Sequence, residues 1–319
     1  MRAILLQPIP KTKACSLLSV VLLFWVSCKP YTPSVDRMQQ EWLQEDYLGT
    51  LVEANALLSD GDTQCHVLVL RASAYRKILK EELAKNDLLT ASRRFPECEE
   101  ATLELARLYA QSGDTTRAIS FINRLLQPNS ALKPLAHIEL AMIRFMQDNF
   151  DAALGELNKA TATDSLNALA WYYKGYLRSR FVDPDGSSGK KPFALFSFSE
   201  AMQHFNRSIA LNPRFADAWF QRGIVHLNEF RDAQGLADLQ QALRLDPINA
   251  SYHVGRAEYY LRIGNWKAAI ADADSAISLQ PGDFSAWEVR AAAYRKSGNV
   301  AQAQRDEQRA LQIRKAPKP

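Results

Sequence analysis

The chain repeats its pattern of small residues at a nearly constant interval. Alanine or glycine returns at steps of 34, 35, 34, 48, 34 and 34 residues, and a second series keeps similar steps. The first series is Ala72, Ala106, Ala141, Gly175, Gly223, Ala257 and Ala291, and the second is Ala84, Ala118, Ala153, Ala201, Gly235, Ala269 and Ala303. A unit of this length cannot bury an apolar face alone, so neighbouring units must stack. The pattern therefore predicts one elongated array, in place of the two compact domains that the length of 319 residues suggests.

Aromatic residues and prolines keep the same register. They include Trp171, Trp219 and Trp287 at one position of the unit, and Pro213, Pro247 and Pro281 at another. Together with the small residues they resemble the tetratricopeptide repeat, a helix–turn–helix unit of 34 residues. The resemblance covers about residues 65–315 in seven units, with a partial unit at about 36–62 and a tail at 316–319. It implies an all-α helical-hairpin solenoid, a right-handed superhelix, with Gly264 and Gly298 at hairpin turns and the prolines ending second helices.

Residues 1–27 have the pattern of an export signal. Positive charge without any acid comes first, and residues 14–27 form an apolar run too short to span a bilayer. The run ends at Val26-Ser27-Cys28, which resembles the lipobox of bacterial lipoproteins, although Trp25 departs from its usual aliphatic residue. The resemblance implies that Cys28 is lipidated, that residues 28–35 form a tether, and that the protein is anchored in the cell envelope, at the outer membrane facing the periplasm. The alternatives are a secreted protein with unmodified Cys28 and an uncleaved anchor.

Charge and residue types exclude several classes of function. Lys and Arg number 39 against 35 Asp and Glu, and three of the positive charges, Arg2, Lys11 and Lys13, lie in the signal. The remaining chain is nearly neutral, whereas a nucleic-acid-binding protein needs a basic face. The few His and Cys residues do not converge in metal-binding spacings, and no Ser–His–Asp or Cys–His arrangement is evident. We therefore expect no nucleic acid, no metal, no cofactor and no enzymatic activity.

Two charged series follow the 34-residue register. They are Arg71, Arg222, Arg256 and Arg290 in the first helices, and Asp87, Asp238, Asp272 and Asp306 in the second helices. Charges that recur in every unit indicate a structural ladder of ion pairs, within a hairpin or to the next one. His226 and His253 stand where other units have Tyr and Trp, and we interpret them as packing variants in preference to metal ligands.

Two cysteines of the repeat region are predicted to form a disulfide. Cys65 opens the first helix of its unit, and Cys98 lies two residues past Pro96, where the second helix ends. Because the helices of a hairpin are antiparallel, these two ends meet at the same edge. An exported protein reaches a compartment that permits disulfides. The alternative is a pair of partly buried free thiols.

One stripe of the first helices is predicted to form the partner-binding groove. In the middle units it is apolar, and its residues are Ile138, Met142, Phe145, Tyr172, Tyr176, Phe220, Ile224 and Leu227. In the outer units it becomes polar at Ser73, Arg76, Arg107, Glu258, Glu288 and Arg295. An apolar centre with a charged rim is typical of a binding site. The alternative is that these side chains only pack adjacent first helices. An insertion at about 180–196 lies nearby, either as a functional loop or as a tolerated surface insertion.

The resemblance to tetratricopeptide repeats implies a non-enzymatic scaffold or adaptor that binds a protein or peptide in its concave groove. A second hypothesis is a lipoprotein that binds carbohydrate or peptidoglycan through the aromatic residues of the middle units. The sequence does not indicate which partner is bound or how many copies of the chain assemble.

Overall fold

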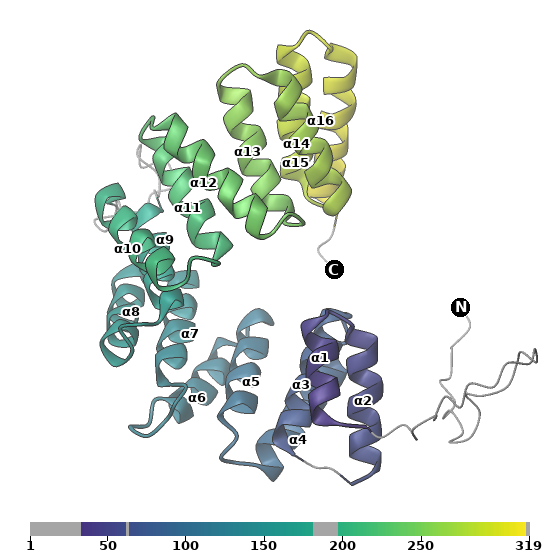
Figure 1. The fold of residues 1–319 in the computed structure, drawn as a ribbon, viewed down its shortest axis with the longest axis vertical. Helices are drawn as coiled ribbons and strands as arrows, with labels where there is room; N and C mark the ends of the chain where they lie inside the picture. Colours follow the sequence, from purple (N-terminus) through teal and green to yellow (C-terminus); the bar gives the residue numbers. More distant parts are fainter. Residues whose placement is uncertain (1–32, 62–63, 181–196, 317–319) are drawn as a thin grey trace, which may run out of the picture.

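The structure is a computed structural model that describes residues 33–61, 64–180 and 197–316. This part of the chain folds into sixteen α-helices and contains no strand (Figure 1). The helices form successive hairpins: α1 (Val35–Leu43) with α2 (Tyr47–Ser59), α3 (Cys65–Lys77) with α4 (Glu81–Arg94), α5 (Glu99–Gln111) with α6 (Thr115–Leu125), α7 (Lys133–Met146) with α8 (Phe150–Thr163), α9 (Ala168–Ser179) with α10 (Phe198–Leu211), α11 (Ala216–Asn228) with α12 (Asp232–Leu245), α13 (Ala250–Arg262) with α14 (Trp266–Leu279), and α15 (Phe284–Lys296) with α16 (Val300–Lys315). The predicted all-α helical-hairpin solenoid is confirmed.

The small residues of the two series are the points at which the helices of a hairpin touch. Every member of both series is buried. In the hairpin of α11 and α12, a Cβ on Gly223 would lie 3.1 Å from the carbonyl oxygen of Gly235, and a Cβ on Gly235 would lie 2.3 Å from the side chain of Leu227. The two backbones therefore approach more closely than larger side chains permit.

Every hairpin turn that lies wholly within the described residues passes through a left-handed residue. Gly264 and Gly298 have φ of 81° and 88°, as the sequence predicted. Other turns place non-glycine residues there, including Leu79 at 60° and Phe230 at 59°. The side chains of Leu79 and Phe230 are both 84% exposed. The turn geometry is thus fixed by the packing of the two helices, even where the local residue disfavours it.

The ends of the second helices follow from proline. The helices α10, α12 and α14 stop two residues before Pro213, Pro247 and Pro281. The residue between helix and proline leaves the helical region in each case, with φ between −138° and −141° and ψ between 80° and 90°, because proline disfavours helical geometry at the residue before it. The indole N–H of Trp219 donates to the carbonyl of Pro213 at 2.9 Å, and Trp287 makes the same bond to Pro281 at 3.1 Å. Proline and tryptophan together fix the path from one hairpin to the next.

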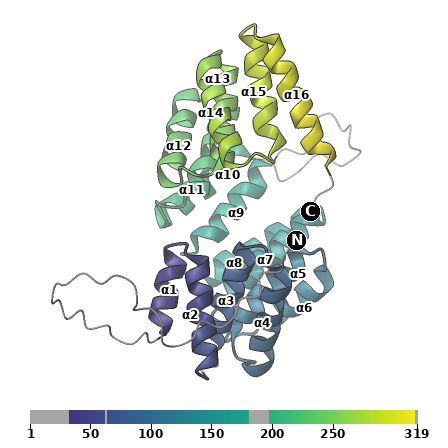
Figure 2. The same cartoon turned by 90° about the vertical axis from the view of Figure 1, so that its right-hand side faces the viewer.

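The curvature of the array separates two faces. The backbones of successive odd-numbered helices approach one another closely from α1 to α15, whereas those of successive even-numbered helices in the described residues do not. Elements inside a curve lie closer together than those outside it, so the odd helices line the concave side and the even helices the convex side (Figures 1 and 2). None of the sixteen helices described is long and apolar enough to cross a membrane.

The Arg and Asp series form the predicted ladder of ion pairs. In each of four hairpins the arginine donates through two N–H groups to both carboxylate oxygens of the aspartate sixteen residues later, at 2.6–2.8 Å. The aspartates are only 4–7% exposed. A third N–H reaches the preceding hairpin in three cases: Arg71 to Asn55, Arg222 to Asn206, and Arg290 to Asp274. The ladder therefore joins the helices within a hairpin and also joins neighbouring hairpins.

The middle hairpins lack this ladder. The Arg and Asp positions hold Leu105 with Phe121, then Leu140 with Glu156, then Lys174 with His204. Burial and the nearby Lys174 ammonium lower the pKa of His204 to about 4, so this imidazole is neutral at physiological pH. Glu156 instead accepts a 2.7 Å hydrogen bond from His137. The regular ion pairs thus belong to the two ends of the array.

Removing one carboxylate of the ladder should be costly. We expect Asp87→Ala to lower the free energy of unfolding by about 2–3 kcal/mol, because Arg71 is left half-buried without its partner. The matched control is Glu307→Ala, which breaks an ion pair to Arg295 whose side chains are 46% and 50% exposed. It should cost less than about 1 kcal/mol. Urea unfolding measures both; equal losses would contradict a structural role for the ladder.

Cys65 and Cys98 are joined by a disulfide with their Cα atoms 6.4 Å apart. Cys65 is the first residue of α3, and Cys98 caps the N-terminus of α5. The bond therefore ties the start of one hairpin to the start of the next, at one edge of the solenoid.

The disulfide closes a loop with a sequence separation of 33 residues. By loop entropy it should stabilise the folded chain by about 3–4 kcal/mol. We expect dithiothreitol to move the urea midpoint of the wild-type chain to lower concentration and to leave the double variant Cys65→Ser/Cys98→Ser unchanged. A wild-type midpoint that ignores the reductant would argue against the bond.

Candidate protein-binding groove

On the inner face of the N-terminal half, the charged side chains form ion pairs with one another. Arg76 of α3 donates to Glu104 of α5 at 2.5 Å, and Arg107 donates to Glu104 and to Glu139 of α7 at 2.7 Å each. Burial and the two carboxylates act in opposite directions on Arg107, and its pKa is raised overall. This chain of ion pairs crosses three odd helices and leaves little unpaired charge for a partner.

The apolar stripe in the middle of the array divides into two sets of side chains. Ile138, Tyr172 and Leu227 are buried, with exposures of 1%, 9% and 6%. The other five residues are half-buried: Met142, Phe145, Tyr176, Phe220 and Ile224. The buried set packs helices together, so only part of the predicted stripe is accessible to a partner.

Tyr172 and Phe220 hold neighbouring helices together. The Tyr172 ring lies 4.9 Å from the ring of Phe215, and burial raises the pKa of its hydroxyl well above the usual value. The Phe220 ring stacks on Tyr252 of α13 at 4.8 Å and covers Gly255, where a Cβ would lie 2.6 Å from it. Phe220 is thus a packing residue of the α11–α13 contact, although part of its side chain is exposed.

Met142, Tyr176 and Ile224 share a register, each one residue after a small residue of the first series. The Phe145 ring meets Tyr176 edge-on at 5.9 Å. The guanidinium of Arg180 lies 4.7 Å above the Tyr176 ring and donates to its hydroxyl. Met142, Phe145, Tyr176 and Ile224 form the accessible apolar part of the inner face. We call this surface the central groove.

The family model of the tetratricopeptide repeat matches residues 69–134, 227–284 and 254–318. The chain contains tetratricopeptide repeats. Such repeats bind protein or peptide partners and are generally non-enzymatic scaffolds, and stacked repeats present an extended concave surface. The accessible residues of the central groove lie on the concave surface of this chain, between the two stretches that the family model matches.

Two curated relatives match parts of the chain. Human superkiller complex protein 3 is 25% identical over an alignment of 249 positions that covers 66% of this chain and 15% of that protein. The tetratricopeptide repeat-containing protein trd-1 of Caenorhabditis elegans is 20% identical over 137 residues, 43% of this chain and 16% of its own length. This chain thus matches about one sixth of each relative.

Solved structures show the same fold. A tetratricopeptide repeat protein from Parabacteroides merdae superposes with a TM-score of 0.56 at 16% identity, covering 81% of this chain and 96% of that one. A monomeric mutant of IFIT1 with Gppp-AAAA superposes with a TM-score of 0.60 at 14% identity, covering 89% of this chain and 72% of that one.

Glu258, which the sequence placed only among the polar residues of the outer units, borders the central groove on α13. It follows Ala257 and so shares the register of Met142, Tyr176 and Ile224, but it carries a carboxylate. Burial by its surroundings raises the pKa of this carboxyl. Its signal in the sequence is an acid at a position that is apolar in the three preceding units.

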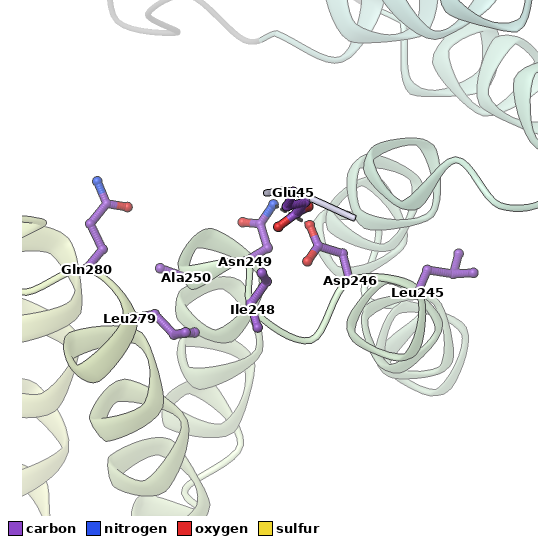
Figure 3. A pocket seen from close by; sticks show the side chains of 8 residues that line it. All are labelled: Glu45, Leu245, Asp246, Ile248, Asn249, Ala250, Leu279 and Gln280. Carbon is purple, nitrogen blue, oxygen red and sulfur yellow. Dashed lines mark hydrogen bonds between the residues drawn. The ribbon is translucent and has the colours of Figure 1, made fainter. Parts of the chain in front are cut away.

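A second concavity lies where the two ends of the array approach each other. A cavity of about 610 Å³ is lined by Glu45 of the α1–α2 turn and by residues of the α12–α13 and α14–α15 loops. Figure 3 shows Glu45 beside Asn249 and Asp246, and Asn249 donates to Asp246 at 3.3 Å. The lining side chains include two acids and no base, so charge attraction does not hold the ends together here.

Other predicted residues have structural places or lie outside the described part of the chain. His253 is 3.4 Å from a carboxylate oxygen of Asp272 and 3.1 Å from the carbonyl oxygen of Pro247. Burial lowers the pKa of His226, which lies 3.9 Å from Asp238. Within residues 33–61, 64–180 and 197–316, no group of three or more His, Cys, Asp or Glu side chains could hold a metal ion. Cys28 and residues 181–196 of the predicted insertion lie outside these ranges.

The packing role of Phe220 can be tested through the glycine that it covers. We expect Gly155→Ala, in α8 and with open space at its Cβ, to stabilise the chain by about 0.5–1 kcal/mol. Gly255→Ala makes the same change in α13 but pushes against the Phe220 ring, and it should destabilise by about 1–2 kcal/mol. Urea unfolding compares the two. Equal stabilisation would mean that the ring moves aside freely and that Phe220 is available to a partner.

Proposed function

We propose that the chain is a non-enzymatic scaffold lipoprotein of the bacterial cell envelope that binds a segment of a partner protein in its central groove. The observation that carries the proposal is the continuous inner face of odd helices, accessible and apolar at Met142, Tyr176 and Ile224. On either side of this region the inner face is polar, with Arg107 before it and Glu258 after it.

The distribution of apolar surface supports binding of a protein segment. Binding sites commonly have a water-excluding apolar centre with a polar rim, and a few large side chains supply most of the affinity. Tyr176 offers a ring that Phe145 supports from one side. The ion pairs of α3, α5 and α7 hold the N-terminal wall in place, so binding does not require ordering of that wall.

The binding test uses crosslinking in the native host followed by mass spectrometry. In the groove variant Met142→Ser/Ile224→Ser, recovery of the crosslinked partner should fall at least about tenfold, because each lost anchor is worth roughly 1 kcal/mol or more. The control is Leu83→Ser/Leu311→Ser on the convex helices α4 and α16, where these leucines are 46% and 49% exposed. It should recover the partner normally. Equal recovery by both variants would reject the groove as the binding site.

Two observations support the envelope location. Val26-Ser27-Cys28 follows a charged and apolar leader, and the repeat region carries the Cys65–Cys98 disulfide, a bond typical of exported proteins. We propose that Cys28 carries the lipid anchor and that the array is held at the outer membrane, facing the periplasm.

The anchor test compares wild type with Cys28→Ser. We expect the wild-type chain to incorporate radiolabelled palmitate and to fractionate with membranes. The variant should lose the label, leave the membrane fraction and accumulate as a larger unprocessed precursor. Identical fractionation of both chains without label would contradict the lipoprotein proposal and leave the groove proposal standing.

A further inference from the structure

Among the charged residues of the polar stripe, Glu258 differs from the others. Arg76 and Arg107 bond Glu104, Glu288 accepts from Arg314, and Arg295 donates to Glu307. For Glu258, the described residues provide neither a hydrogen bond nor an ion pair. It is therefore the one charge of that stripe that the array does not neutralise within its described part.

The position of Glu258 places it at the C-terminal boundary of the central groove. Gly255 lies three residues earlier on α13, and so on the same side of that helix. A Cβ on Gly255 would lie 3.6 Å from the end of the Ile224 side chain on α11. Glu258 also holds on α13 the repeat position that Ile224 holds on α11, so the two residues lie at equivalent places on neighbouring inner helices.

The surroundings of Glu258 favour a cation. The Glu258 side chain is exposed on the inner face, where the surrounding helices shield it from part of the solvent and raise its pKa, and no nearby positive charge counteracts that effect. A bound segment would cover this carboxylate and remove its remaining water, and a lysine or arginine of the segment would offset that cost by pairing with it. A second carboxylate in the same place would add to it.

We propose that the central groove selects a peptide segment in which a lysine or arginine pairs with Glu258 and a large apolar side chain packs on Ile224 and Tyr176. This inference rests on the proposed function and specifies the chemistry of the partner. Packed helices lie about 8–10 Å apart, and an extended peptide advances about 3.3 Å per residue. The basic residue and the apolar residue that reaches Ile224 are therefore about three positions apart in the partner.

The test is an array of synthetic nonapeptides with one central Leu or Phe and one Lys, Gln or Glu placed one to four positions away in either direction. The full chain, purified in detergent, is applied as wild type, Glu258→Gln and Glu82→Gln. Glu82 is an 83%-exposed side chain of the convex helix α4, so its variant makes the same charge change outside the groove. We expect the wild type to prefer Lys over Gln about three- to tenfold, most strongly at a spacing of about three.

The variants distinguish this inference from the proposed function. Glu258→Gln should keep binding the apolar peptides but lose the preference for Lys, and Glu82→Gln should keep both. Glu258→Lys should reverse the preference toward Glu, while thermal melting shows that each variant folds. A wild type that binds without preferring Lys, or a Glu258→Gln chain that keeps the preference, overturns the inference alone. A wild type that binds no peptide, or that binds them as well as Met142→Ser/Ile224→Ser does, overturns the proposed function and the inference together.

Discussion

The close contact between the two helices of each hairpin is the constraint on which the rest of the structure depends. Small residues allow the backbones to meet, and a Cβ on Gly223 would already lie 3.1 Å from the Cβ of Asp238. This approach brings Asp238 within reach of Arg222, and the same arrangement recurs in three other hairpins. The aspartate is tolerated in the interior because a bidentate arginine satisfies both of its oxygens. Close packing and ion pairing therefore support each other in these four hairpins.

The array combines two kinds of inner surface. At the N-terminal end, Arg76, Glu104, Arg107 and Glu139 neutralise one another across neighbouring helices and act as structural links. In the middle, where the Arg–Asp ladder is interrupted, the same face becomes apolar and half-buried. The regular, strongly paired ends frame a less regular centre, which is the arrangement expected when a scaffold keeps its shape while one region remains available for binding.

Much of the fold could be predicted because the same residue types recur at equivalent positions, so a position that is ambiguous in one unit can be interpreted from the other units. Gly264 and Gly298 indicated the turns, and the 34-residue spacing of Arg256 and Arg290 indicated ion pairs, since a functional site would not recur in each unit. The turns at Leu79 and Phe230 were not predictable, because tertiary packing there imposes a backbone geometry that these residues disfavour.

The groove was less predictable than the fold for a geometric reason. Phe220 and Ile224 lie one helical turn apart, and periodicity places both on one stripe. Only the position of α13 reveals that the Phe220 ring covers Gly255 tightly, whereas Ile224 makes a looser contact there. The absence of a partner for Glu258 is likewise a property of neighbouring helices, and the sequence of α13 does not contain it.

The approach of Glu45 to Asn249 has a mechanical consequence. Five complete hairpins separate the α1–α2 turn from the α12–α13 loop, and these two points face each other across one cavity. A small rotation at each intervening interface changes the curvature in the same sense, so the displacements add along the array. The width of that cavity therefore changes measurably when the curvature of the solenoid changes. The distance between two labels, one on each side of the cavity, would report an increase or decrease in that curvature.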